Sequence, residues 1–197
     1  MDDEGHHVGR HQFDPRRMQH RPSDGRGVFA PEEFLAAFLT NPTTVLADIG
    51  CGPGYFALPA ARMLPAGRVL AVDLQQQSLD ILTSRAQSEG ILNIDAIRAD
   101  AAALPFPDAS VDAVLMARFL NSLPQRDAIL REALRVLRGG GRLFLVQWDR
   151  VETPMGPPFA IRIGADEMQR ILASIGFELE RVWPGPEPFY RVLARKP

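Results

Sequence analysis

The chain has 197 residues, of which 46% are hydrophobic and 23% are charged, and its formal net charge at pH 7 is −2. This composition is typical of one globular domain, because domains usually hold about 100–200 residues. No apolar run approaches the roughly 20 residues that cross a bilayer, and the polar N-terminus has no signal-peptide core, so we expect no membrane partner. The single cysteine excludes an internal disulfide and favours a cytoplasmic location.

The basic residues are scattered along the chain, and all of them except Lys196 are arginine. A nucleic-acid-binding protein would gather positive charge on one face. We therefore expect no nucleic-acid partner and interpret most of the arginines as solvated surface residues.

Residues 1–30 show no sustained hydrophobic periodicity, which predicts an irregular arm that could act as a lid over the site. The arm contains all the histidines of the chain, which are His6, His7, His11 and His20. They could bind a metal ion, but no cysteine or acidic spacing supports that role, so we expect no metal.

From residue 31 onward the pattern is regular. PEEFLAAFL predicts a short helix that begins at Pro31. Apolar runs typical of strands then alternate with amphipathic runs typical of helices. The predicted strands are residues 44–49, 68–73, 94–99, 111–117 and 142–148, and the predicted helices are residues 55–64, 75–88 and 124–137. Such alternation predicts a parallel sheet with helices on both faces.

One proline disturbs the first of these helices, and a run of glycines should end the last. Pro59 should kink the first helix after the glycines or delay its regular turns, because proline lacks the N–H that a helix interior needs. The glycines at 139–141 should end the helix that precedes them.

The tail departs from this alternation. It predicts a helix over 166–175 and then strands over 176–183 and 189–196, joined by the turn PGPEP. So short a connection requires antiparallel pairing. The predicted fold is α/β: a doubly wound, Rossmann-like seven-stranded sheet, mostly parallel with an antiparallel C-terminal hairpin strand, in a single domain over residues 31–197.

Three glycines, Gly50, Gly52 and Gly54, lie within five residues between the first predicted strand and its helix. At this place a doubly wound sheet binds nucleotide-like ligands through backbone N–H groups. The loop differs from the dinucleotide fingerprint, because Tyr55 stands where the third glycine belongs. It also lacks the Lys and Ser or Thr of a P-loop.

Three aspartates, Asp48, Asp73 and Asp100, stand at or beside the ends of the first three predicted strands. Asp73 follows Gly50 by 23 residues, close to the spacing of about 20 at which an acidic residue accepts hydrogen bonds from ribose hydroxyls. For each aspartate the alternative role is a turn cap.

At these residues the sequence resembles the class I S-adenosylmethionine-dependent methyltransferases, in particular the small-molecule branch of the methyltransferase type 11/25 kind. The motifs that carry the resemblance are LADIGCGPGYFA, VLAVDL, RADAAALPFPDASVDAVLMA and LREALRVLRGGGRLFLVQW. It is strong over residues 45–146 and implies methyl transfer from S-adenosylmethionine to a small-molecule acceptor by in-line displacement.

The resemblance also implies roles for individual residues. Asp48 and Gly50 would hold the methionine amino end, and Asp73 would accept hydrogen bonds from both ribose hydroxyls. Leu74 would pack on the adenine, and Asp100 would accept from its amino group. The implied cofactor-binding residues are Asp48, Gly50, Cys51, Gly52, Gly54, Asp73, Leu74, Asp100, Ala101 and Arg118.

The acceptor side is less defined, since a general base is needed only if the acceptor must lose a proton. The catalytic candidates at the ends of the fourth and fifth strands are Arg118, Asn121 and Asp149, with Gln147 and Trp148 beside them. Arg118 could instead be a surface ion-pair partner, and Trp148 a core residue. Cys51 is expected to be a small buried side chain.

Two other functions stay open at this stage. A nicotinamide-dependent oxidoreductase would share the core and Asp73, although Tyr55 and the terminal hairpin argue against it. A non-catalytic S-adenosylmethionine-binding protein would have the same core. The NPPY and DPPY patterns of enzymes that methylate nucleic-acid bases are absent after the fourth strand.

Overall fold

The computed structural model describes residues 30–154, 156–184 and 188–197. The predicted arm, apart from its last residue, and the four histidines lie outside the described residues. The elements in chain order are α2 (Pro31–Ala36), β1 (Val45–Ile49), α3 (Ala57–Met63), β2 (Arg68–Asp73), α4 (Gln76–Ser88), β3 (Ile94–Arg98), β4 (Val111–Ala117), η2 (Leu120–Ser122), α5 (Arg126–Val136), β5 (Leu137–Trp148), η3 (Phe159–Ile161), α6 (Ala165–Ile175), β6 (Glu178–Pro184) and β7 (Phe189–Arg195).

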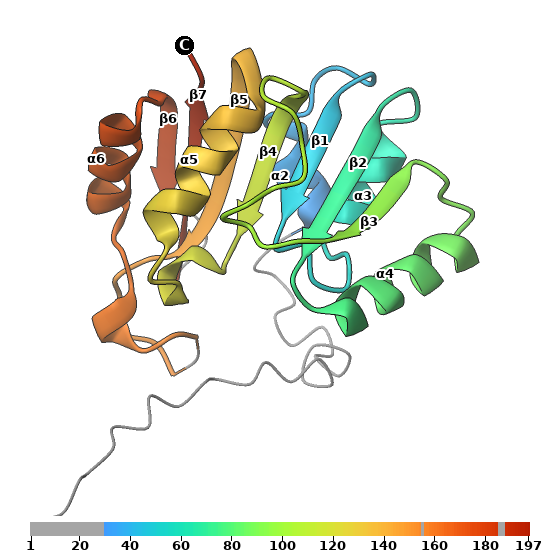
Figure 1. Cartoon of the computed structure of the whole chain (residues 1–197). Coiled ribbons are helices and arrows are strands. Elements are labelled where there is room, and N and C mark those ends of the chain that lie inside the picture. The colour runs from blue at the N-terminus through green and yellow to red at the C-terminus, as the bar shows by residue number, and fades with distance from the viewer. Residues whose placement is uncertain (1–29, 155, 185–187) are drawn as a thin grey trace, which may run out of the picture.

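The strands form one sheet with the order β3-β2-β1-β4-β5-β7-β6 (Figure 1). Neighbouring strands from β3 to β5 are parallel, whereas β7 is antiparallel to both β5 and β6. The predicted antiparallel ending is confirmed: β7 lies between β5 and the edge strand β6. The short link between β6 and β7 leaves antiparallel pairing as the available arrangement.

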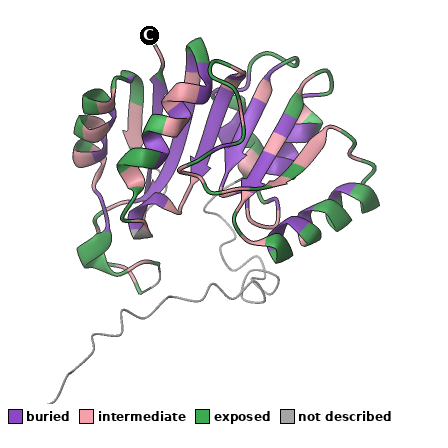
Figure 2. Ribbon diagram, viewed as in Figure 1, coloured by how far each residue is buried: buried purple, intermediate pink, exposed green. Residues whose placement is uncertain are grey.

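Helices cover both faces of the sheet, as predicted. One core joins the sheet to α2, α3 and α4, and a second core joins it to α5 and α6, which lie in front of the sheet in Figure 1. The central strands are buried along most of their length (Figure 2), because helices exclude water from both of their faces. In the described part of the chain, no helix combines the length and the apolar character that a bilayer span requires.

Pro59 has the effect that the sequence predicts. Helix α3 begins at Ala57, two residues after the predicted start, so Pro59 is its third residue. At this position a backbone N–H has no partner within the helix, so proline costs the helix no hydrogen bond.

The predicted role of the glycines at 139–141 is wrong. Helix α5 ends at Val136, and these glycines lie inside β5, which begins at Leu137. The pairing of β4 with β5 shifts register here, from Val111 opposite Leu137 to Ala113 opposite Arg142. The glycine run therefore forms an irregular stretch of a strand, where extra residues bend the chain.

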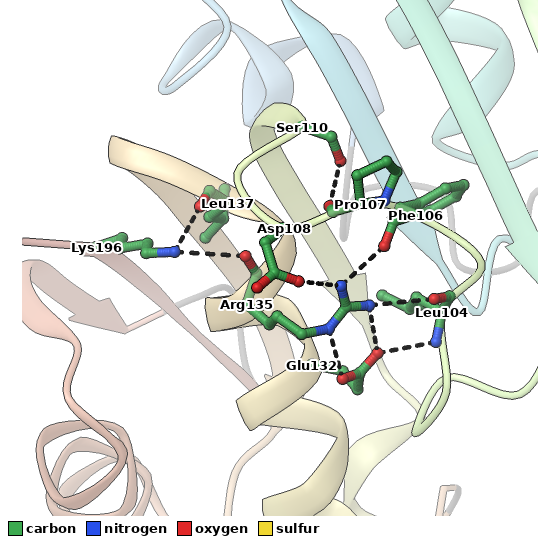
Figure 3. Close-up of polar contacts among 9 residues, drawn as sticks. All are labelled: Leu104, Phe106, Pro107, Asp108, Ser110, Glu132, Arg135, Leu137 and Lys196. Atoms are coloured by element: carbon green, nitrogen blue, oxygen red, sulfur yellow. Dashed lines mark hydrogen bonds and ion pairs between the residues drawn. The ribbon is translucent and has the colours of Figure 1, made fainter.

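The loop between β3 and β4 is attached to α5 by Arg135 (Figure 3). Its guanidinium donates two hydrogen bonds to the Glu132 carboxylate and others to Asp108 and to the carbonyls of Leu104 and Phe106. Glu132 also accepts a hydrogen bond from the backbone N–H of Leu104 at 2.9 Å. Arginine suits this place because its planar fork reaches several acceptors at once.

Candidate functional site

The candidate site lies where the strand order changes direction. The chain passes from β1 outward through β2 to β3 and then returns to β4 on the other side of β1. In open α/β sheets, ligands bind beyond the carboxyl ends of the strands at such a switch point. The glycine loop after β1 and the segment after β4 therefore face each other across the site.

Glycine is needed at the three loop positions for different structural reasons. All have positive φ angles: 73° at Gly50, 53° at Gly52 and 90° at Gly54. A Cβ atom at Gly50 would lie 2.8 Å from Phe119, and one at Gly54 would lie 2.4 Å from Leu82. At Gly52 a Cβ atom would meet nothing within 4 Å. Gly50 and Gly54 thus permit close packing within the protein, while Gly52 leaves its backbone open to a ligand.

Asp73 ties the glycine loop to the end of β2. Its Oδ2 accepts a hydrogen bond from the Gly52 N–H at 2.8 Å, and its Oδ1 accepts one from the Gln75 N–H at 2.9 Å. Asp73 therefore caps these turns, which is the alternative role that the sequence left open. Because each carboxylate oxygen has two acceptor sites, Asp73 can still accept hydrogen bonds from a ligand.

Asp48 is a buried carboxylate at the base of the loop. Its exposed fraction is 1%, and its Oδ2 has no hydrogen-bond partner among the described residues. Burial, and secondly the charge of Asp73, raise the pKa of Asp48 to about 7. An unpaired charge in such a place is costly. A ligand cation beside Asp48 would supply the missing donor and positive charge.

The ends of β2 and β3 present polar and apolar surface next to each other. Leu74 is 62% exposed directly after β2. Asp100 is exposed after β3, and its Oδ1 accepts a hydrogen bond from the Ala102 N–H at 2.9 Å. The half-buried Ala101 follows Asp100 in the loop that Arg135 holds in place. An exposed leucine beside a carboxylate suits a flat ligand with a polar edge.

Cys51 is buried between Gly50 and Gly52. Burial raises the pKa of its thiol, and the charges of Asp48 and Asp73 raise it further. The side chain therefore stays a neutral thiol and behaves as a small apolar group, as expected from the sequence.

Arg118 extends over the glycine loop from the end of β4. Its guanidinium carbon lies 5.3 Å from the centroid of the Tyr55 ring. Its backbone has φ 64°, a left-handed conformation that costs a residue other than glycine about 1–3 kcal/mol. Its backbone N–H donates a hydrogen bond to the Val146 carbonyl at 2.7 Å, which attaches the backbone of Arg118 to β5. The structure thus brings Arg118 to the predicted cofactor loop.

The other acceptor-side candidates have different surroundings. Asn121 is buried, and its Nδ2 donates to the Trp148 carbonyl at 3.1 Å. Trp148 is buried against Phe189, which agrees with the core role that the sequence left open. Gln147 is fully buried, and Asp149 accepts a hydrogen bond from the N–H of the next residue. Of these residues, Asn121 lines the pocket described next.

This pocket has a volume of about 410 Å³ and lies beyond the ends of β4 and β5, beside α6. Its lining residues are Asn121, Leu123, Pro124, Arg126, Arg150, Ala160, Ile161, Arg162, Ile163 and Glu167. Sequence reasoning missed Arg126, Arg150 and Glu167. Arg150 follows Asp149 at the end of a predicted strand, which is a signal that could have found it, whereas Glu167 carries no such signal.

Comparison with known proteins identifies the family. The family model described as a methyltransferase domain matches residues 47–145, which are 99 of the 197 residues. The ubiquinone/menaquinone biosynthesis C-methyltransferase UbiE of Pseudomonas putida is 36% identical over 105 residues. That match covers 52% of this chain and 41% of the relative, so the chain spans about two fifths of the length of the relative.

Solved structures agree with this assignment. A SAM-dependent methyltransferase from Aquifex aeolicus superposes with a TM-score of 0.83 at 25% identity, covering 93% of this chain and 99% of that one. The [4+2]-cyclase SpnF shares the fold, with a TM-score of 0.76 at 22% identity, over 85% of this chain and 80% of that one. The sheet order, the glycine loop and the family match lead to one assignment. The chain belongs to the methyltransferase domain family and has the fold of the class I S-adenosylmethionine-dependent methyltransferases.

Proposed function

We propose that this chain transfers a methyl group from S-adenosylmethionine to a small-molecule acceptor. The observation that carries the proposal is the buried Asp48 carboxylate, whose Oδ2 has no hydrogen-bond partner in the described chain. S-adenosylmethionine has an ammonium group that fits this carboxylate, and it supplies a methyl group activated by a sulfonium. The open backbone at Gly52 fits a ligand that lies against the loop.

The sheet order supports an arrangement for the whole cofactor. Asp48 is the residue before the end of β1, Asp73 ends β2 and Asp100 follows β3, so the three lie at the carboxyl ends of neighbouring parallel strands. Of these three, Asp48 would bind the ammonium, Asp73 the ribose hydroxyls and Asp100 the adenine amino group. The remaining residues proposed to contact the cofactor are Gly50, Cys51, Gly52, Gly54, Leu74, Ala101 and Arg118.

The protein contributes mainly position and exclusion of water, because in-line displacement at an activated methyl group needs little other assistance. Asn121 and Arg118 cannot take up a proton, since an amide is not basic and a guanidinium is already protonated. Asp149 does not line the pocket, whereas Glu167 does. We therefore infer that Glu167 accepts the proton if the acceptor must lose one.

Turnover with labelled cofactor tests the proposal. The protein is incubated with methyl-labelled S-adenosylmethionine and a metabolite extract, and labelled products are identified by mass spectrometry. We expect label in a small molecule with wild-type protein and a large loss of label with Asp48→Asn. Cofactor binding without label transfer in any extract would favour a non-catalytic binding protein or another reaction on this fold.

The same preparation tests the oxidoreductase alternative. Titration with NADH, followed by its fluorescence, should show no saturable binding, while S-adenosylhomocysteine should bind. The opposite pattern would contradict the proposed function.

We also infer a cytoplasmic location and an acceptor other than nucleic acid. The support is the single cysteine, whose thiol stays neutral and buried, and the scattered arginines. Cell fractionation and a filter-binding assay with RNA and DNA test these two points.

A further inference from the structure

We propose that the methyl acceptor is an amphipathic organic anion bound in the pocket beyond β4 and β5. A carboxylate or phosphate of the acceptor binds Arg126 and Arg150, and a hydroxyl or amine of the acceptor donates a hydrogen bond to the Oδ1 of Asn121. The apolar body of the acceptor contacts Leu123 and Ile161. This inference rests on the proposed methyl transfer and gives that site a substrate class.

The pocket is connected to the cofactor loop through one short segment. Phe119 packs against Gly50, as its 2.8 Å distance from a Cβ placed there shows. Asn121 follows two residues later in η2 and lines the pocket. The segment that packs against the glycine loop therefore also contributes to the wall of the pocket.

Asn121 presents a hydrogen-bond acceptor that no described protein group uses. Its exposed fraction is 6%, and its Nδ2 donates to the Trp148 carbonyl at 3.1 Å. Since a carbonyl can only accept, the amide nitrogen must face Trp148 and the oxygen must face away from it. Its Oδ1 has no hydrogen-bond partner within the described residues. A buried acceptor left without a donor destabilises the fold, which a ligand hydroxyl would remedy.

Two further polar atoms are also buried without a hydrogen-bond partner among the described residues. They are the Nε of Arg126, at the start of α5, and the hydroxyl of Tyr190, in β7. Two lining residues from different elements, Asn121 in η2 and Arg126 in α5, thus carry buried polar atoms without a hydrogen-bond partner among the described residues, as expected for a site that binds a polar ligand.

The charge of the lining favours an anion. Three arginines and one glutamate line the pocket, which leaves an excess of two positive charges. Arg126 pairs only loosely with Asp127, at 3.7 Å, and the Arg150 guanidinium lies over the Phe159 ring. Arginine is the side chain that binds carboxylate and phosphate groups through two parallel hydrogen bonds.

The apolar residues of the lining define the rest of the ligand. Leu123, Pro124, Ala160, Ile161 and Ile163 are lining residues, and Ile161 is 41% exposed. A wholly polar ligand would leave this apolar surface in contact with water. A volume of about 410 Å³ is within the usual range for sites that bind small organic molecules.

Matched probes test the substrate class by calorimetry, with S-adenosylhomocysteine bound to the protein. The probes are 3-(4-hydroxyphenyl)propanoate, its neutral primary amide, and 3-phenylpropanoate, which lacks the hydroxyl. We expect the hydroxylated acid to bind about 10- to 100-fold more tightly than the amide, because an arginine–carboxylate pair contributes a charge-assisted hydrogen bond. It should also bind more tightly than 3-phenylpropanoate.

Variants of the lining test which residues are responsible. Arg126→Gln and Arg150→Gln should each reduce the preference for the acid over the amide, and Asn121→Ala should remove the preference for the hydroxyl. Arg131→Gln is the matched control, since Arg131 is exposed on the same helix as Arg126 and does not line the pocket. It should keep both preferences.

The outcomes separate this inference from the proposed function. If wild-type protein binds S-adenosylhomocysteine but not the acid at millimolar concentration, or binds acid and amide equally, the substrate class is wrong and the cofactor assignment stands. An acid preference that persists in both arginine variants also overturns the inference. Failure to bind S-adenosylhomocysteine would overturn the inference and the proposed function together.

Discussion

The Arg118 guanidinium lies over the ring of Tyr55, with 5.3 Å between its carbon and the ring centroid. Tyr55 belongs to the glycine loop after β1, and Arg118 follows β4, so this cation–π contact crosses the switch point of the sheet. The left-handed backbone of Arg118 is a conformation that other packing must hold in place. We interpret the pair as a contact that orders the glycine loop before the cofactor binds.

The ring, rather than the hydroxyl, of Tyr55 should matter for this order. Tyr55→Leu should weaken S-adenosylhomocysteine binding by about 2- to 5-fold, because an exposed cation–π contact contributes about 0.5–1 kcal/mol. Tyr55→Phe keeps the ring and serves as the control, with nearly unchanged affinity. Isothermal titration calorimetry measures both, and equal affinities of the two variants would contradict the interpretation.

Asp48→Asn should stabilise the free protein while weakening cofactor binding. The pKa of the Asp48 carboxyl is raised from 3.8 to about 7, so above pH 7 the wild-type protein carries a buried negative charge. The amide of the variant carries no charge. We expect a gain of about 1–4 kcal/mol in the free energy of unfolding at pH 8. Affinity for S-adenosylhomocysteine should fall about 10- to 150-fold, through loss of a charge-assisted hydrogen bond.

The stability gained by Asp48→Asn should depend on pH. Because the pKa of Asp48 is higher in the folded state, the folded protein binds more protons between about pH 4 and pH 7 than the unfolded chain does. The contribution of Asp48 to stability is therefore complete below about pH 4 and is lost as the pH rises through 7. Denaturant melts should show the advantage of Asp48→Asn growing over this range. A constant difference between the two proteins would show that another cause operates.

Gly52→Ala should prevent cofactor binding without unfolding the protein. Gly90 provides a matched control, since it also has a positive φ angle, 67°, and space for a Cβ atom. Both alanine variants should lose a similar stability of about 1 kcal/mol from backbone strain. Calorimetry should show loss of S-adenosylhomocysteine binding in Gly52→Ala alone. Normal binding by Gly52→Ala would mean that the ligand does not lie against this backbone.

Arg135→Lys should destabilise the protein by about 1–3 kcal/mol, because lysine cannot reproduce hydrogen bonds to Glu132, Asp108 and the loop carbonyls at the same time. Arg131→Lys, on the exposed side of the same helix, should change stability by less than about 0.5 kcal/mol. Thermal melts at pH 7 measure both variants.

Acid should reduce the effect of Arg135→Lys. The hydrogen bond from Arg135 is the main cause that lowers the pKa of Glu132 below its ordinary 4.5. Stabilisation by this pair is therefore present above pH 4.5 and is lost as the pH falls through the pKa of the folded state. Wild-type and Arg135→Lys stabilities should approach each other near pH 3, and a gap that widens in acid would contradict this account.

The sequence by itself determined the order of helices and strands, the antiparallel ending and the position of the glycine loop. These features depend on hydrophobic period, proline and glycine placement and connection length, which are local properties of the chain. The delayed start of α3 followed from Pro59 in the same way. The aspartates at strand ends were also visible, because parallel strands bring their carboxyl ends to one edge.

The tertiary structure decided the rest. The glycines at 139–141 lie in β5 because the strand is held by distant partners on both sides of them. Leu137 pairs with Val111 of β4, and Gly140 and Gly141 exchange backbone hydrogen bonds with Lys196, which follows β7. The close approach of Gly54 to Leu82, the unpaired oxygen of Asp48 and the pocket around Asn121 all depend on side chains from separate elements. Arg126 and Glu167 line the same pocket because α6 packs on α5. The local sequence pattern determines each helix and strand. Burial and the convergence of distant side chains follow from the order of the strands in the sheet.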